Sequence, residues 1–298
     1  MHDLPFVDAH VHLWDLKRIR YGWLTPPFSD DGPNGSVAAI AHTYLLDDYR
    51  TESVKWNVVG MVHVEAGADV SHALLETAWL DEMAQQQGLP SGLVAFAALE
   101  DPDLESLLTA HTRHKRVRGI RQIVNWHNNP HRTYTPRDLT EDEAWQKGFA
   151  LLAKYGLSFD LQAYPVQFPA LARLIARHPD IPVIINHAGM GIDDPASWRA
   201  GMKLLAAHPH VSVKISGLGF CFRPWDRRRV RPRVRETIEI FGSARVMFAS
   251  DFPTDRLFAP FNATLETYAG AIADLSEDEK RAVWGGNANR IYRLGLDL

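Results

Sequence analysis

The 298-residue sequence predicts an α/β fold of the (β/α)8 TIM-barrel type, as a single domain over residues 1–298. Three observations predict this fold. The chain contains eight short apolar runs, segments with apolar residues at helical spacing separate these runs, and the length suits a barrel. Strands that alternate with helices form right-handed crossover units and a parallel sheet, and eight units close into a barrel. An open doubly wound sheet is the alternative, but no glycine-rich phosphate loop follows the first run.

The eight predicted strands are spread evenly along the chain. They cover residues 6–11, 57–64, 92–99, 116–124, 156–163, 181–186, 211–216 and 244–250. Helical spacing of apolar residues is clearest over 71–88, 101–114 and 167–179. Gly88, Gly156 and the His-Pro pairs at 178–179 and 208–209 stand where helices should stop.

Three connections are longer than a minimal barrel needs. They cover residues 15–56 after the first strand, 125–138 after the fourth and 217–229 after the seventh. All three leave the carboxyl ends of predicted strands, where barrels of this type assemble their active sites. Their tryptophan, tyrosine and phenylalanine residues indicate ordered loops, so we expect long βα loops that shape a functional site.

The first strand ends in FVDAHVHLWD, with His10 and His12 two residues apart. Residues at this spacing in a strand point to the same face, so the two imidazoles can hold one metal ion. A pair of buried core histidines is the alternative. Polar residues also end most of the other predicted strands: His63, Glu65, Arg121, Asn125, Asp160, Gln162, His187, Lys214, Ser216 and Asp251. Imidazole and carboxylate groups together suit Zn²⁺ or a similar divalent ion.

These motifs resemble the amidohydrolase superfamily. FVDAHVHLWD, INHAG from Ile185 and MFASDFP from Met247 carry the resemblance, in that order along the chain. YGWL, VRGIRQ, FDLQAYP, VKISGL and GGNANRIYRL extend it over essentially the whole sequence. The most similar branch is the amidohydrolase-2 lactonase group, which includes L-fuconolactonase, L-rhamnono-lactonase and 2-pyrone-4,6-dicarboxylate lactonase-like proteins.

The resemblance implies roles for four residues. His10 and His12 match the metal-binding pair of the first strand, and Asp251 matches an aspartate that deprotonates the attacking water and also contacts the metal. His187 matches a histidine that is a metal ligand or polarises the carbonyl. Many dinuclear members have Lys or Glu at the end of strand four and His at the end of strand five. This chain has Arg121 or Gln122 and Asp160 or Gln162 there, so we expect either one divalent metal (Zn²⁺ or Mn²⁺) or a metal-independent site.

We therefore expect a hydrolase that opens a sugar-acid or aromatic-degradation lactone, with Asp251 as general base. The guanidinium of Arg121 can bind substrate oxygens at the barrel mouth, or it can close the barrel end through a buried ion pair. Glu65 can likewise partner a cation or contact substrate. His127, Tyr164 and Trp225 are the remaining candidates for substrate binding. A metal-dependent decarboxylase or hydratase is the alternative function, and a non-catalytic binding protein is a third.

Composition excludes other classes of function. The formal net charge is −4, and no uninterrupted apolar run is long enough for a membrane span, so we expect no nucleic-acid or membrane partner. Seven arginines lie between residues 223 and 235, and we read them as a solvated helix face or a rim for an anionic substrate. One cysteine, Cys221, and an N-terminus without a signal pattern favour the cytoplasm. A homodimer is the default expectation for oligomeric state.

Overall fold

The computed structural model describes residues 1–298, and its centre is a sheet of eight parallel strands. Each strand pairs with the next along the chain, in the order β1 to β8. The strands are β1 (Phe6–Val11), β2 (Val58–Val64), β3 (Gly92–Phe96), β4 (Val117–Ile123), β5 (Ser158–Gln162), β6 (Val183–Ile185), β7 (Val211–Ile215) and β8 (Val246–Phe248). Backbone hydrogen bonds from His12 N to Phe252 O (2.8 Å) and from Asp251 N to His10 O (2.9 Å) join the β1 edge of the sheet to its β8 edge. The predicted barrel is confirmed.

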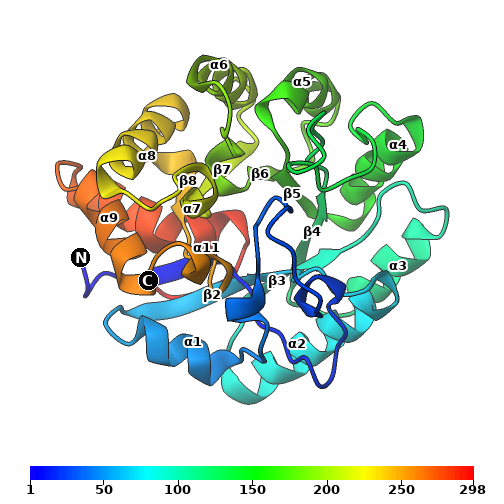
Figure 1. The fold of residues 1–298 in the computed structure, drawn as a ribbon, viewed down its shortest axis with the longest axis horizontal. Coiled ribbons are helices and arrows are strands. Elements are labelled where there is room, and N and C mark those ends of the chain that lie inside the picture. The colour runs from blue at the N-terminus through cyan, green and yellow to red at the C-terminus, as the bar shows by residue number, and fades with distance from the viewer.

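Helices surround the strands, as Figure 1 shows. They are α1 (Leu46–Ser53), α2 (Ala73–Gln87), α3 (Leu104–His111), α4 (Glu143–Leu151), α5 (Phe168–Arg177), α6 (Pro195–Ala206), α7 (Leu218–Cys221), α8 (Arg227–Phe241), α9 (Phe261–Ala271), α10 (Glu277–Arg281) and α11 (Asn287–Ile291). Short turns of 3-10 helix include η6 (His187–Gly189) and η8 (Thr254–Leu257). The three helices with the clearest predicted spacing are α2, α3 and α5, and Gly88 ends α2 in the left-handed conformation.

Several strands are shorter than the sequence predicts. The third ends at Phe96 rather than at residue 99, and the eighth ends at Phe248 rather than at residue 250. The apolar runs continue past the last hydrogen bond between paired strands, because the turns that follow are also buried. In the structure His187 and Asp251 therefore lie just beyond β6 and β8, on the turns.

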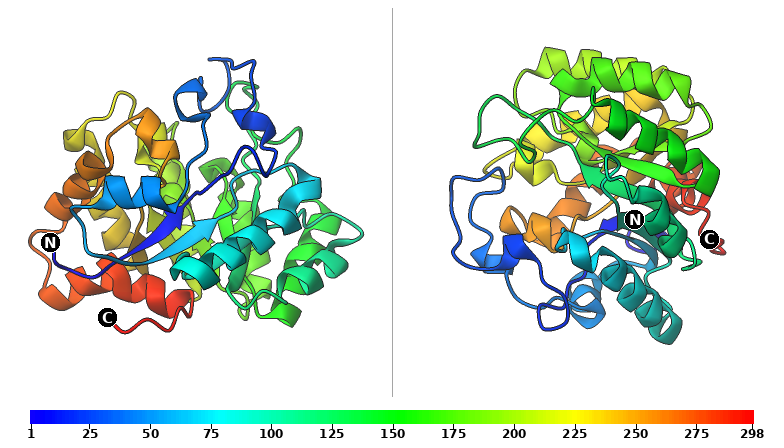
Figure 2. Two further views of the ribbon diagram at one scale, coloured as in Figure 1. Left: turned by 90° about the horizontal axis from the view of Figure 1, so that it is seen from below. Right: turned by 90° about the vertical axis from the view of Figure 1, so that its right-hand side faces the viewer.

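Apolar side chains form two layers of core. The larger cluster fills the space between the strands and the ring of helices. A smaller cluster fills the barrel itself and contains Val7, Ala9, Val62, Val64, Val94, Ile184, Met247, Ala249, Ala288 and Tyr292. Ala288 and Tyr292 come from the C-terminal segment, which closes the amino-terminal end of the barrel (Figure 2). The opposite end is left for the loops.

A buried ion pair lies within the barrel below that open end. Lys214 Nζ of β7 is 2.8 Å from Asp160 Oδ1 of β5, and both side chains are inaccessible to solvent. The Tyr292 hydroxyl donates to the same carboxylate at 2.6 Å. The two opposite charges compensate each other there, and the hydroxyl adds a hydrogen bond to the carboxylate, as buried charges require.

The connection between β1 and α1 rises over the open end of the barrel, where Figure 2 shows it above the strands. Trp14 and Tyr44 pair across the two ends of this connection through backbone bonds of 2.9 Å in each direction. The Trp23 indole N–H donates to Ala66 O at 2.8 Å and fastens the connection to the end of β2. None of the helices is long and apolar enough to cross a membrane.

Candidate active site

A bulge in β1 directs both histidines of the HxH motif into the barrel. Val7 and Ala9 belong to the inner core, whereas Phe6 and Val11 belong to the outer core. Strict alternation would therefore direct His10 outward. The register against β2 shifts between Asp8 and Val11, which adds a residue and reverses the phase. As a result the Nε2 atoms of His10 and His12 lie 3.2 Å apart.

Asp251 completes a triangle of metal-binding atoms with these histidines. Its Oδ1 lies 3.4 Å from His10 Nε2 and 3.3 Å from His12 Nε2. All three side chains are buried. Ligands around tetrahedral Zn²⁺ at about 2.0–2.1 Å stand roughly 3.3 Å from one another, which is the spacing of this triangle. The donor set therefore fits one divalent ion with an open position.

The protonation of the histidines favours the same role. His12 Nδ1 donates to Val64 O at 2.8 Å, which leaves the lone pair on Nε2 free. Burial, with the nearby Arg121 cation, lowers the pKa of His12 to about 3. Burial and the charge of Lys214 lower the pKa of His10 well below its ordinary value. Both imidazoles are therefore neutral at physiological pH and available to a metal.

His187 lies on the other side of Asp251. Its Nδ1 is 3.0 Å from Ser216 Oγ and 3.9 Å from Asp251 Oδ2. Burial lowers the pKa of His187 to about 4. Gly217 leaves room for the His187 ring, because a Cβ at residue 217 would stand 2.3 Å from His187 Nδ1. The two carboxylate oxygens of Asp251 thus face different partners: Oδ1 faces the HxH pair and Oδ2 faces His187.

Arg121 forms a buried ion pair with Glu65 beside this cluster. Arg121 Nε donates to Glu65 Oε1 at 2.6 Å, and its Nη2 donates to the Glu65 backbone oxygen at 2.6 Å. Its Nη1 donates to Gln162 Oε1 at 3.0 Å and lies 3.4 Å from His10 Nε2. This is the ion-pair alternative that the sequence left open for both residues. The guanidinium is committed to protein partners rather than free for a carboxylate.

The cluster forms the floor of an inner chamber of about 250 Å³. The lining residues are His12, Trp23, Asn34, Ala66, Gly67, Arg121, Ile123, Tyr134, Gln162, His187, Phe220, Asp251 and Thr254. Apart from the Arg121–Glu65 pair and Asp251, the wall carries no charge. The chamber can hold a small, uncharged, ring-shaped molecule against the metal-binding triangle.

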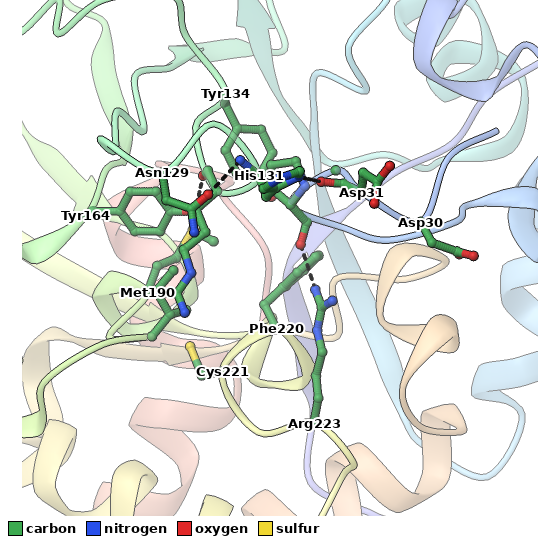
Figure 3. A pocket seen from close by; sticks show the side chains of 14 residues that line it. Asp30, Asp31, Asn129, His131, Tyr134, Tyr164, Met190, Phe220, Cys221 and Arg223 are labelled. Carbon is green, nitrogen blue, oxygen red and sulfur yellow. Dashed lines mark hydrogen bonds between the residues drawn. The ribbon is translucent and has the colours of Figure 1, made fainter. Parts of the chain in front are cut away.

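An outer chamber of about 460 Å³ adjoins the inner one, and Tyr134 and Phe220 line both. Figure 3 shows Tyr164 and Met190 on one side of it and Asp31 on the other. Its lining is more polar than that of the inner chamber, and it includes the charged residues Arg132 and Arg223.

The remaining predicted substrate-binding residues lie farther out. Tyr164 lines the outer chamber, and its hydroxyl donates to Arg132 O at 2.7 Å. His127 stacks edge-on against Tyr164 and pairs with Asp193 at 3.2 Å, outside the lining of both chambers. Trp225 lines a separate hollow between α8 and α9. The structure thus brings His10, His12, His187, Asp251, Arg121 and Glu65 together but leaves His127 and Trp225 apart from them.

Several residues that line the inner chamber were not predicted: Trp23, Asn34, Tyr134, Phe220 and Thr254. All come from the loops after β1, β4, β7 and β8. The sequence signal for them was the length of three of those loops together with their aromatic content. That signal identified the segments without identifying which side chains turn inward.

Comparison with known proteins identifies the family of this chain. The amidohydrolase family model matches residues 7–294. An uncharacterized protein of Sinorhizobium fredii is 38% identical over 99% of this chain and 100% of its own length. An L-fucono-1,5-lactonase of Burkholderia ambifaria is 27% identical over 97% of this chain and 95% of its own. The crystal structure of a Burkholderia multivorans amidohydrolase with bound zinc superposes with a TM-score of 0.80, at 27% identity, over 97% of this chain and 99% of the other.

Proposed function

Because this chain belongs to the amidohydrolase family, we propose that it is a hydrolase that opens the ring of a sugar-acid lactone, with Asp251 as general base. The observation that carries the proposal is the convergence of His10, His12, His187 and Asp251 on the floor of one chamber. Two relatives, 27% and 28% identical along nearly the whole chain, are named L-fucono-1,5-lactonase, which supports a lactone as substrate.

The inner chamber favours a sugar lactone over a carboxylated one, because the cation in its wall, Arg121, is already paired with Glu65. A substrate carboxylate needs a cation with free donors, and Arg121 gives its donors to Glu65 and Gln162. Trp23, Tyr134 and Phe220 supply flat apolar surface. Sugar rings combine apolar faces with hydroxyl groups, so they suit a wall of aromatic and neutral polar side chains.

Asp251 moves the proton in the proposed reaction. Its Oδ2, on the side of His187, takes a proton from water as the water oxygen attacks the lactone carbonyl carbon. The tetrahedral intermediate then collapses, the bond between the carbonyl carbon and the ring oxygen breaks, and Asp251 returns the proton to that oxygen. The product is the open-chain hydroxy acid. His187, neutral at physiological pH, can donate a hydrogen bond to the carbonyl oxygen.

A divalent ion would be held by His10, His12 and Oδ1 of Asp251. When bound, such an ion supplies Lewis-acid stabilisation of the developing negative charge, worth several kcal/mol. The zinc-bound neighbour supports Zn²⁺ as the first ion to test.

Proton release is the direct test. The protein would be mixed with a panel of aldono-1,4- and 1,5-lactones, and with 2-pyrone-4,6-dicarboxylate, in weak buffer with a pH indicator. We expect turnover of at least one aldonolactone. The Asp251→Asn variant should lose about 10²- to 10⁴-fold in kcat, the range of a general base. Turnover of the dicarboxylate alone would contradict the sugar-lactone proposal. No turnover of any lactone would refute lactone hydrolysis and redirect the search to decarboxylation.

A further inference from the structure

The tip of the connection between β1 and α1, residues 29–35, lies across the mouth of the barrel. Three hydrogen bonds from other loops hold it. His131 Nδ1 bonds Asp31 O at 2.9 Å, the Tyr134 hydroxyl donates to Asn34 Oδ1 at 2.5 Å, and Arg223 Nη2 donates to Pro33 O at 2.9 Å. Figure 3 shows the bonds made by His131 and Arg223. We refer to residues 29–35 as the strap.

Only one residue of the strap, Asn34, lines the inner chamber. It does so next to Tyr134, which lines both chambers. Tyr134 is anchored independently of the strap by a backbone bond from its N–H to Asn125 O (2.9 Å) at the end of β4. The polar pair therefore has a fixed position on the wall.

The hydrogen bond within the pair determines what the pair can offer a ligand. A phenol has one hydrogen, and Tyr134 gives it to Asn34 Oδ1. Burial raises the pKa of Tyr134 far above its ordinary value, so the hydroxyl keeps that hydrogen. The Tyr134 oxygen retains its lone pairs as an acceptor, and the Asn34 amide retains two N–H donors. A donor and an acceptor side by side match a hydroxyl group, which both donates and accepts.

Two other polar groups on the same wall are already bonded within the protein. The Trp23 indole N–H is bonded to Ala66 O, and the Arg121 guanidinium is bonded to Glu65 and Gln162. We propose that Asn34 and Tyr134 act together as a specificity-determining pair that binds one hydroxyl group of the lactone. This inference rests on the proposed function and deepens it, because it makes ring-hydroxylated lactones the preferred substrates.

The test compares an aldono-1,5-lactone that the wild-type protein opens with δ-valerolactone, which has the same ring and no hydroxyl groups. Tyr134→Phe and Asn34→Leu should each lower kcat/KM about 10-fold on the hydroxylated lactone, the cost of one hydrogen bond and an unpaired partner. Neither should change kcat/KM on δ-valerolactone by more than about twofold. Because the two residues bind one group, the double variant should lose no more than either single variant.

Two matched controls separate recognition by the pair from displacement of the strap and from loss of stability. His131→Leu removes a different bond to the strap and should leave the ratio of the two kcat/KM values unchanged. Tyr155→Phe removes a phenolic hydroxyl on the outer surface, where Tyr155 hydrogen-bonds Thr109. The melting temperature of Tyr134→Phe is compared with that of this variant.

The outcomes can be told apart. Equal losses on both lactones, or no loss on either, would overturn the assignment of the pair while leaving lactone hydrolysis intact. A change in the ratio for His131→Leu as large as that for Tyr134→Phe would show that strap position, rather than the pair, sets specificity. Failure of the wild-type protein on every lactone would refute the proposed function itself.

Discussion

The Arg121–Glu65 pair should dominate the stability of the open end of the barrel. Its side chains are 5% and 3% exposed, and the two charges lie 2.6 Å apart. Glu65→Gln would keep the shape of the side chain and remove its charge, leaving the Arg121 cation buried without a counter-charge. Glu65 Oε2 also accepts from Gly67 N at 2.8 Å, so the change would disturb the chamber wall as well.

Removing one partner of a buried ion pair costs about 3–5 kcal/mol, since the other charge stays desolvated. For a chain somewhat larger than 250 residues, each kcal/mol lowers the melting temperature by about 2–4 °C. Glu65→Gln should therefore melt roughly 10 °C below the wild-type protein.

Calorimetry or circular dichroism would measure the shift. The matched control is Glu141→Gln, which removes the charge from the Arg173–Glu141 pair, whose side chains are 64% and 69% exposed. Exposed pairs contribute little, so this variant should melt within about 2 °C of wild type. The double variant Glu65→Leu/Arg121→Met should recover much of the lost stability, because no charge remains buried. If Glu65→Gln melts no lower than Glu141→Gln, the reasoning about the buried pair is wrong.

Two further predictions concern the metal and pH. Dialysis against a chelator should lower lactone turnover, and added Zn²⁺ should restore it, because three neutral or anionic ligands stand at tetrahedral spacing. Elemental analysis should then find about one ion per chain. Turnover that survives complete removal of metal would assign His10 and His12 to substrate binding instead. Burial raises the pKa of Glu76 from 4.5 to about 8, so the folded protein holds a proton that the unfolded chain releases, and stability should fall as pH rises between those values. Glu76→Gln keeps an oxygen that accepts hydrogen bonds from Tyr21 and Ala66, so it should remove most of this pH dependence. The free energy of unfolding, measured with urea at pH 5 and pH 8, would show the difference. An equal change in that free energy for the variant and the wild-type protein would contradict the assignment to Glu76.

The barrel and the centre of the site could be predicted because both depend on local patterns. Apolar runs at regular intervals specify the strands, and parallel strands bring their carboxyl ends to one rim. His10 lies near the end of such a run, and His12, His187 and Asp251 each follow one within three residues, so their convergence follows from the fold. The phase of β1 does not follow from it, because the bulge between Asp8 and Val11 is defined only by pairing with β2.

The chamber wall could not be predicted, because bonds between distant residues position it. Asn34 faces the inner chamber next to Tyr134, one hundred residues away, and the strap is bonded to Arg223 farther still along the chain. No local pattern encodes such contacts. Trp225 illustrates the same limit: it belongs to a long loop at the correct end of the barrel, yet the loop directs it toward the hollow between α8 and α9.

Backbone strain is concentrated on the same two turns as the chemistry, because four of the five non-glycine residues with positive φ lie there. Asp251 has φ 58° and His187 has φ 52°, in the left-handed region that residues with a Cβ seldom adopt. Glycine would relieve this strain at either position, and glycine is what the chain uses at Gly217, where φ is also 58°. At residues 251 and 187 the chain instead bears a cost of about 1 kcal/mol or more for each side chain. A strained carboxylate and a strained imidazole, both buried and 3.9 Å apart, are costly as structural elements, which favours a role for both in the reaction.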